Sequence, residues 1–189
     1  MQVIRAKGYS GTTVDDICSA AGLTKGAFFH HFESKEDLAV AAAEHFSQMA
    51  GRLFGAAPYR ELADPLDRLL GYIDFRAGIL SGPLPQFTCL LGTMVQEAYD
   101  THPAIRRACD TYIGAHASEV AKDIAAAKAL YAPSAQWSAE SLALYTQAVL
   151  QGAFVLAKAR GGPDVACDCL AHLRRYLVQL FHRPTSKEE

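Results

Sequence analysis

The sequence lacks the features by which several classes of protein are recognised. No apolar stretch approaches the roughly 20 residues that a membrane-spanning helix needs, and the first five residues lack the apolar run of a signal peptide. The five cysteines are an odd and scattered set, unlike the paired framework of a secreted disulfide protein. We therefore expect free thiols, no membrane partner and a cytoplasmic location.

The motifs of common enzyme classes are also missing. The sequence has no phosphate-cradling glycine loop, no nucleophile elbow and no His-Glu-x-x-His array. Its seven histidines are spread thinly, and the adjacent His30 and His31 cannot together form one facial metal site. We expect no catalytic residue, no metal and no cofactor, so the protein is predicted not to be an enzyme.

An excess of positive charge is lacking as well. The formal net charge of the chain is −2, which argues against a protein that holds nucleic acid by a global positive field. The first 35 residues carry four basic side chains against three acidic ones, a net charge of +1. Charge gives no strong indication of nucleic-acid binding, so that prediction must come from the geometry of a motif.

Helical signals dominate what is present, and no segment shows sustained period-two alternation, so the sequence predicts an all-α fold. A Gly-Tyr-Ser-Gly turn at residues 8–11 breaks an opening helical fragment, and Gly22 ends the helix that follows. Threonine and serine at the predicted helix starts are good N-terminal caps. The first predicted helices run from Thr12 or Thr13 to Ala20, from Thr24 to about Phe32, and from Ser34 to about Phe54.

The remaining sequence predicts five further helices. Asp64 before Pro65 is a good start signal, residues 81–85 are expected to form a loop, and Asp164 is expected to cap the last helix. The polar tail from residue 182 is expected to be disordered. The five predicted helices cover approximately residues 65–80, 87–100, 103–131, 138–160 and 164–181.

Residues 13–32 predict two short helices joined by a glycine turn, a geometry in which the second helix can enter a major groove about 12 Å wide. The expected inner face consists of Val14, Ile17, Cys18, Leu23, Phe28 and Phe32. The outer face keeps Thr24, Lys25, Ala27, His30 and His31, which include donors for phosphates or base edges. An ordinary helical hairpin with a solvated outer face is the alternative.

The amino-acid sequence of this segment favours the DNA-binding interpretation. Residues 8–17 and 20–38, about a fifth of the chain, closely resemble the DNA-binding head of the TetR family of regulators, and residues 151–157 look like the family's penultimate helix. The resemblance implies an N-terminal three-helix helix-turn-helix head and a C-terminal helical ligand-binding and dimerisation domain. The corresponding predicted ranges are 1–45 for the head, 46–181 for the helical domain and 182–189 for the tail.

Carried over by position, the resemblance implies a set of DNA-binding residues. Phe29 replaces the family's usual tyrosine and its phenolic hydroxyl, so His30 either supplies that contact or simply packs. Only seven residues precede Gly8, so either upstream residues are absent or the first helix lacks half its length. The predicted DNA-binding residues are Thr13, Thr24, Lys25, Gly26, Ala27, Phe29, His30, His31 and Lys35.

Apolar stripes at near-heptad spacing in the last two predicted helices are usually monomer core. For a protein that reads two half-sites, the resemblance makes an intersubunit four-helix bundle the better interpretation. The predicted homodimer interface consists of Leu142, Tyr145, Val149, Gly152, Leu170, Leu173, Leu177 and Leu180.

The middle helices are rich in aromatic and flexible apolar residues, which either fill the core or line an apolar pocket with a few polar groups. Cys89 is expected in the first turn of its helix, as a buried packing thiol or as a redox-sensing one. The predicted ligand-binding residues are Tyr72, Phe75, Phe87, Cys89, Met94, Gln96, Tyr112 and His116.

The sequence thus predicts a ligand-responsive transcriptional regulator of the repressor type. It would bind a palindromic double-stranded DNA operator as a homodimer and be released by a small-molecule inducer. The alternative is a helical small-molecule or partner-binding module without specific DNA readout. The sequence discloses neither the inducer, nor the operator and its genes, nor whether the effect is repression or activation.

Overall fold

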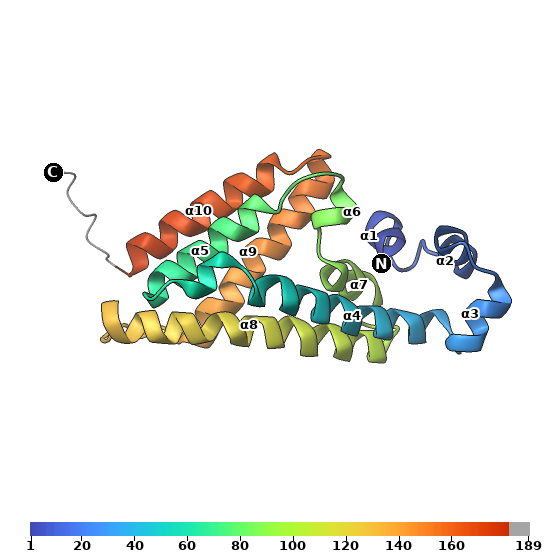
Figure 1. The fold of residues 1–189 in the computed structure, drawn as a ribbon, viewed down its shortest axis with the longest axis horizontal. Coiled ribbons are helices and arrows are strands. Elements are labelled where there is room, and N and C mark those ends of the chain that lie inside the picture. Colours follow the sequence, from blue (N-terminus) through green and yellow to red (C-terminus); the bar gives the residue numbers. More distant parts are fainter. Residues whose placement is uncertain (182–189) are drawn as a thin grey trace. The chain divides into compact units, whose positions relative to one another are not determined.

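The computed structural model describes residues 1–181, which form helices joined by short turns (Figure 1). This part of the chain contains no strand, which confirms the all-α prediction. It divides into two compact units: residues 1–54 with 82–115, and residues 55–81 with the chain from residue 116 onward. The tail predicted to be disordered, residues 182–189, lies outside the described residues.

The first unit contains the N-terminal helices and the middle of the chain. Helix α1 packs against α2, α6 and α7, and α2 packs against α3. Its core joins Ile4 and Tyr9 to alanines of α4, to the apolar face of α7 and to the start of α8. The helices are α1 (Gln2–Lys7), α2 (Val14–Ala21), α3 (Lys25–His31), α4 (Lys35–Gly55), α6 (Leu84–Phe87), α7 (Leu90–Ala98) and the first part of α8 (Pro103–Tyr131).

The starts and stops of α2 and α3 follow the predicted signals. The Thr13 side chain accepts a hydrogen bond from the Asp16 amide, and the Asp16 carboxylate accepts one from the Thr13 amide, which completes a capping box. Gly22 ends α2 with φ 65°, a left-handed conformation that glycine adopts without a steric penalty. The Thr24 side chain then accepts from the Ala27 amide and starts α3. Two short helices at residues 14–31 are therefore set by local chemistry.

The segment between residues 81 and 100 differs from the prediction. A short helix, α6, occupies part of the expected loop, because Pro85 lies in its first turn, where a missing N–H costs nothing. The next helix begins at Leu90 and not at Phe87, since Thr88 and Cys89 are extended. Cys89 is the N-cap of α7, and its Sγ accepts from the Gly92 amide at 3.4 Å.

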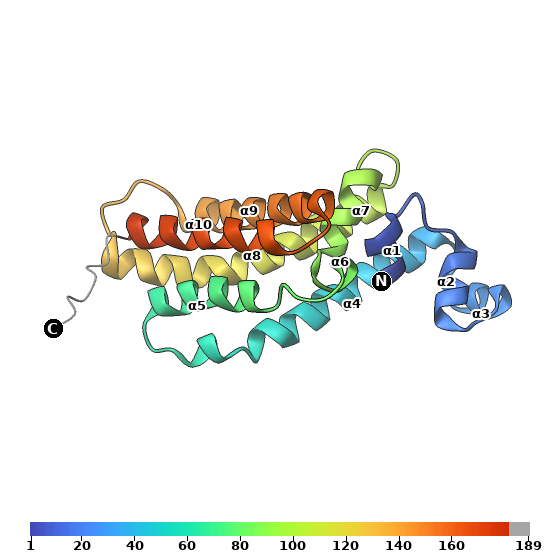
Figure 2. The same cartoon turned by 90° about the horizontal axis from the view of Figure 1, so that it is seen from above.

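The second unit contains η1 (Pro58–Glu61), α5 (Pro65–Gly78), the end of α8, α9 (Ala139–Arg160) and α10 (Asp164–Leu180). Helix α10 packs against both α9 and α5 (Figure 2). As predicted, Asp64 caps α5: its Oδ1 accepts from the amides of Leu66 at 2.8 Å and Asp67 at 3.1 Å. The predicted side-chain cap of α10 was wrong, because Asp164 is already helical and Pro163 precedes it without a capping bond.

Helix α9 is long and apolar enough to cross a membrane by length and composition alone. Its qualifying window has a mean hydropathy of 1.2 and is 44% buried inside the protein. The buried residues include Leu142, Leu150 and Phe154, and α9 packs along α10. A core helix passes the same test, so this is weak evidence for a membrane span.

Candidate functional site

The α2–turn–α3 segment has an apolar inner face. Cys18 and Phe28 are buried, and the Phe28 and Phe32 rings lie 5.7 Å apart. Val14, Ile17 and Phe32 are half-buried. Leu23 was wrongly predicted to belong to this face: it follows the left-handed Gly22 and is 56% exposed. Because the Leu23 side chain is exposed, Phe28 and Phe32 are the residues of α3 and its C-cap that pack on the inner face.

The opposite face of α3 carries most of the predicted DNA-binding residues. Phe29 is 56% exposed, and its ring meets Phe28 edge-on at 5.1 Å. Ala27 is half-buried and permits close approach of a partner to this helix. The structure thus brings a donor-rich set of exposed residues onto one short helix and its cap: Thr24, Lys25, Gly26, His30 and His31.

Lys25 has a carboxylate partner from the neighbouring helix. Its Nζ lies 3.0 Å from Oδ1 of Asp15, and both side chains are more than half exposed. An exposed pair of this kind contributes little to stability, so Lys25 can exchange Asp15 for a phosphate at small cost. This pairing was not predicted from the sequence.

Thr13 was predicted to bind DNA, but its hydroxyl already makes a hydrogen bond within the protein. Its hydroxyl lies 2.8 Å from Oδ2 of Asp16, while the Lys7 ammonium lies 2.6 Å from the other Asp16 oxygen. These contacts, Lys7 first and Thr13 second, hold the pKa of Asp16 well below its usual range. Asp16 is therefore a carboxylate at neutral pH, and the Thr13 hydroxyl proton is directed toward it rather than toward solvent.

Lys35 lies beside the turn that precedes α2. Its Nζ donates to the carbonyl oxygens of Tyr9 at 3.0 Å and Thr12 at 2.9 Å, and it lies 4.3 Å from the centre of the Tyr9 ring. An ammonium has three N–H groups, so two are used within the protein. Phosphate binding by Lys35 stays a prediction, and the structure adds a role in holding the turn.

The same turn is held by residues of α7 and of the segment after it that were not predicted from the sequence. Oε2 of Glu97 accepts from the Ser10 amide at 2.7 Å, and the Tyr9 ring meets the His102 ring edge-on at 5.1 Å. Gly8 has φ 82°, and a Cβ at this position would lie 2.2 Å from Oε1 of Glu97. Glu97 had no sequence signal, because nothing local places its carboxylate against residues 87 positions earlier.

In the second unit, two predicted ligand-binding residues meet in a polar network. The Tyr72 hydroxyl lies 3.0 Å from Nε2 of His116. Arg76 contacts both: its Nε donates to the Tyr72 hydroxyl at 3.2 Å, and its Nη2 lies 3.0 Å from the same Nε2. The Gln147 amide also donates to Tyr72, at 3.3 Å. We call Tyr72, Arg76, His116 and Gln147 the polar network.

Burial makes the polar network electrostatically unusual. Tyr72 is 3% exposed and Gln147 is 5% exposed. Burial, followed by the charges of Arg76 and Arg60, lowers the pKa of His116 to about 3. His116 is therefore neutral at physiological pH and can accept a hydrogen bond. Phe75, another predicted ligand-binding residue, lies near this network, with its ring 5.9 Å from that of Tyr59.

The other predicted ligand-binding residues lie in the first unit. Met94 is fully buried, while Cys89 and Tyr112 pack at the edge of that core. The exposed Gln96 uses its amide on the Gly92 carbonyl of its own helix, at 2.8 Å. Phe87 is half-buried in α6. Within residues 1–181 no group of three or more His, Cys, Asp or Glu could hold a metal ion.

Cys89 lies close enough to Cys109 for the two thiols to influence each other. The pKa of Cys109 is raised to about 12, mainly by burial and secondarily by Cys89. Cys109 is therefore a protonated, unreactive packing thiol at neutral pH. Both of the predicted roles of Cys89 stay open, and its cap position gives its sulfur a structural contact with the Gly92 amide.

The predicted dimer residues separate into two groups. Leu142, Leu170, Leu173 and Leu177 are at most 5% exposed within the single chain, and their part in a dimer interface stays a prediction. Their heptad-like stripe fills the packing of α9 and α10, as such stripes usually do. Tyr145 is 46% exposed, Gly152 is exposed, and Val149 and Leu180 are half-buried.

A different apolar face of α9 is exposed, with Tyr176 of α10 beside it. The Tyr145 and Tyr176 rings lie 5.4 Å apart, which joins the two helices into one surface. Each large member is at least 41% exposed. We call Leu144, Tyr145, Gly152, Val155, Leu156 and Tyr176 the α9–α10 face.

Comparison with known proteins identifies both parts of the chain. Residues 1–42 match the model of the bacterial regulatory proteins of the tetR family, and residues 65–173 match the tetracyclin repressor-like C-terminal domain. The HTH-type transcriptional repressor DhaR of Mycobacterium sp. (strain GP1) is 31% identical over 105 residues, which are 56% of this chain and 51% of that protein. The chain spans about half the length, or less, of the curated relatives that it matches first.

Solved structures agree over nearly the whole chain. Regulatory protein TetR from Rhodobacter sphaeroides is 27% identical, with a TM-score of 0.80 and 92% of each chain covered. A TetR transcriptional regulator from Chloroflexus aurantiacus is 26% identical, with a TM-score of 0.80 over 94% of this chain and 89% of that one. The C-terminal match alone covers more than half of the sequence, so the chain belongs to the tetR family of bacterial regulatory proteins.

Proposed function

We propose that this protein is a cytoplasmic, ligand-responsive transcriptional repressor that binds a palindromic DNA operator as a homodimer. A small-molecule inducer binds in the helical domain and releases the operator. The observation that carries this proposal is the two-sided α3: Phe28 is buried beneath it, while Lys25, His30 and His31 are exposed. A supported helix with an exposed donor-rich face is the arrangement that reads a major groove.

Selection of bound duplexes from a random pool tests DNA recognition directly. Enrichment of an inverted repeat, with half-site centres about 34 Å or one helical turn apart, is the expected result. Binding without enrichment would favour the alternative, a helical ligand- or partner-binding module without sequence readout. Salt titration of the selected duplex then counts phosphate contacts, because the slope of log affinity against log salt scales with the number of neutralised phosphates.

The α9–α10 face supports a homodimer as the reading unit. Monomeric proteins rarely expose large contiguous apolar surfaces, and along α9 Gly152 lies seven residues, about two turns, after Tyr145 and one turn before Leu156. A Cβ on Gly152 would meet nothing within 4 Å in the single chain, so the backbone there is open to close approach of another helix. A second copy of the same face would form a four-helix bundle, which is also the arrangement that a two-fold operator requires.

Leu156→Glu tests this interface, because it places a charge in the middle of the α9–α10 face. We expect the variant to sediment as a monomer and to bind the selected operator at least tenfold more weakly than the wild type. Leu130→Glu is the control: Leu130 is 64% exposed on α8 and is not a member of the α9–α10 face. If both variants remain dimers, the interface lies elsewhere.

Release by an inducer requires two states of the protein that differ in their affinity for both ligands. A tenfold loss of operator affinity corresponds to about 1.4 kcal/mol of coupling, so useful induction needs more than this. The buried polar network is the region of the second unit with the polar groups to orient such a ligand.

A further inference from the structure

The outer face of α3 carries an aromatic ring that residues 1–181 leave uncovered. Phe29 is 56% exposed, and Leu23, also 56% exposed, is the other large apolar side chain exposed in residues 1–45. The Phe29 ring meets the Phe28 ring edge-on at 5.1 Å, and Phe28 is itself buried, so the base of the Phe29 ring is supported. One exposed ring is ordinary in a folded protein. Its surroundings on α3 therefore decide whether it forms a contact.

Gly26 leaves an open notch beside this ring. Because a helix turns by about 100° per residue, the order around the outer face of α3 is Lys25, Phe29, Gly26 and His30. Apart from the neighbours and backbone of its own helix, a Cβ on Gly26 would meet one atom within 4 Å, Oγ1 of Thr24 at 3.7 Å. Gly26 is not among the positive-φ glycines, and glycine weakens a helix relative to alanine. Neither the backbone nor the packing of residues 1–181 requires glycine here, so its missing side chain leaves room for a partner.

The residue types of α3 limit the bases that it can recognise. In the major groove, arginine reads guanine, asparagine and glutamine read adenine, and aspartate and glutamate accept from cytosine. The helix, Lys25–His31, contains none of these five residue types. Apolar contact with the C5-methyl group of thymine is a further way of reading a base, and phenylalanine is one of the side chains that make it. The exposed ring of Phe29 suits this contact.

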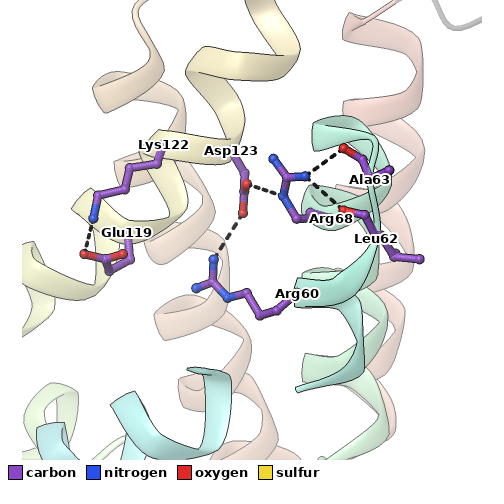
Figure 3. A network of polar contacts seen from close by, with 7 residues as sticks. All are labelled: Arg60, Leu62, Ala63, Arg68, Glu119, Lys122 and Asp123. Carbon is purple, nitrogen blue, oxygen red and sulfur yellow. Dashed lines mark hydrogen bonds and ion pairs between the residues drawn. The ribbon is translucent and has the colours of Figure 1, made fainter. Parts of the chain in front are cut away.

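Arginine, the residue that most often reads guanine, is used elsewhere in the chain. Residues 1–51 contain one arginine, Arg5, whose Nη1 donates to two backbone carbonyl oxygens, each at 3.2 Å. In the second unit, Nε of Arg68 lies 2.7 Å from one oxygen of Asp123, and Nη1 of Arg60 lies 3.3 Å from the other (Figure 3). Base recognition by α3 therefore depends on its lysine, its histidines and its exposed phenylalanine ring.

We propose that Phe29 reads thymine: its ring and the notch at Gly26 accept the C5-methyl group of one thymine in each operator half-site. Thymine presents this methyl group on its major-groove edge, and the other three bases present none there. The contact needs no phenolic hydroxyl, so a phenylalanine serves it fully. This inference rests on the proposed function, because it names a base that the same helix recognises.

Deoxyuridine in place of thymine tests the proposal, because it removes the methyl group and leaves the hydrogen-bonding edge unchanged. Each thymine of the selected duplex would be replaced in turn, in both half-sites together, and the affinity of the full chain measured by fluorescence anisotropy at constant salt. At one symmetric position we expect a loss of about fourfold for each methyl group, and so roughly tenfold or more for the pair. If no position is sensitive, the proposal is wrong.

Phe29→Ala tests the named residue, and Leu23→Ala is its matched control, since the two side chains are equally exposed. At the sensitive position we expect Phe29→Ala to bind the thymine and deoxyuridine duplexes with nearly equal affinity. Leu23→Ala should keep the wild-type ratio. A residue that only supports α3 would weaken binding to both duplexes equally, so an unchanged ratio in Phe29→Ala would overturn the proposal.

Gly26→Ala tests the notch. Alanine favours a helix more than glycine, so this variant should melt no lower than the wild type. Its added methyl group occupies the space that the thymine methyl requires. We therefore expect Gly26→Ala to bind the thymine duplex more weakly than the wild type does, and to lose most of the preference for thymine over deoxyuridine. A full preference in Gly26→Ala would show that the notch does not hold the methyl group.

Failure of this proposal and failure of the proposed function give different results. If selection enriches no inverted repeat, operator binding fails and thymine reading fails with it. If a repeat is enriched but the methyl group has no effect, or its effect persists in Phe29→Ala, the protein recognises an operator without reading thymine through Phe29. A methyl effect that disappears in Phe29→Ala and persists in Leu23→Ala supports both.

Discussion

The α2–α3 segment and the polar network of α5, α8 and α9 use their polar side chains in opposite ways. In the former, lysine, threonine and histidines lie on the outside of a short helix that is supported from below by Phe28. In the latter, tyrosine, arginine, histidine and glutamine turn inward and bond one another among buried leucines. Outward donors suit a large polyanion that cannot enter the protein, and inward donors suit a small guest.

This contrast extends to stability. α2 and α3 are defined by caps and a left-handed glycine, which each contribute about 1 kcal/mol. The second unit depends on fully buried aliphatic side chains such as Leu170 and Leu177. Surface changes in α3 should therefore alter binding with little effect on folding, whereas core changes in the second unit should do the reverse.

The largest expected effect is that of Leu177→Ala. Leu177 is fully buried, so its truncation leaves a cavity and should lower the free energy of unfolding by about 2–5 kcal/mol. Denaturant titration measures this loss. Leu130→Ala, at a position on α8 that is 64% exposed, should change stability by less than about 0.5 kcal/mol. Equal losses would show that the second unit is not held by its internal core.

His116 should give the stability of the protein a defined pH dependence. Its folded pKa of about 3 is lower than its usual 6.5, so the unfolded chain takes up a proton first. Its contribution is complete above pH 6.5 and is lost as pH falls toward 3, at no more than about 1.4 kcal/mol per pH unit. His116→Gln should flatten the stability profile in this window, while His172→Gln, at an exposed position, should not. The measurement is the free energy of unfolding from pH 7 to pH 4. If the profiles of the wild type and of His116→Gln run parallel, His116 is not the source of the pH dependence.

The smallest effects should come from the Lys25–Asp15 pair, and they should have opposite signs. Lys25→Ala should weaken duplex binding and reduce the salt slope by about 1, if Lys25 contacts a phosphate. Asp15→Asn removes a competitor for Lys25 and a charge that repels phosphates, so it should strengthen binding to random duplexes a few-fold. Asp110→Asn, at an exposed position on α8, controls for net charge. Fluorescence anisotropy at several salt concentrations measures all three, and an Asp15 variant that behaves like the Asp110 variant would contradict the pairing argument.

Local chemistry explains what the sequence predicted well. Asp64 before Pro65, Gly22 and Thr24 each act on their immediate neighbours, and the structure places helix boundaries where these residues require them. The predicted helix from Phe87 failed because the break at Thr88 and Cys89 has no glycine or proline to announce it. Packing decides such breaks, and local sequence does not record it.

The site was less predictable than the helices. A heptad-like stripe shows which residues of α10 are apolar, but it cannot tell whether Leu173 faces the same chain or a second copy. Tyr72 and His116 were proposed as ligand-binding residues, yet Arg76 and Gln147 were missed. Arg76 lies one helical turn after Tyr72, and this spacing was the one available signal that the two side chains meet.

The contacts of Lys35 and Glu97 with the Gly8–Thr12 turn have a consequence for protein engineering. Chimeric regulators are made by grafting a DNA-reading head from one protein onto the sensor of another. A junction near residue 45 would keep Lys35 with its turn but would replace Glu97, which holds the Ser10 amide. A graft into a foreign sensor should therefore carry a carboxylate at the equivalent of Glu97, together with an aromatic partner for Tyr9. The N-terminal head of this protein should therefore be transferred together with the part of α7 that contacts its Gly8–Thr12 turn.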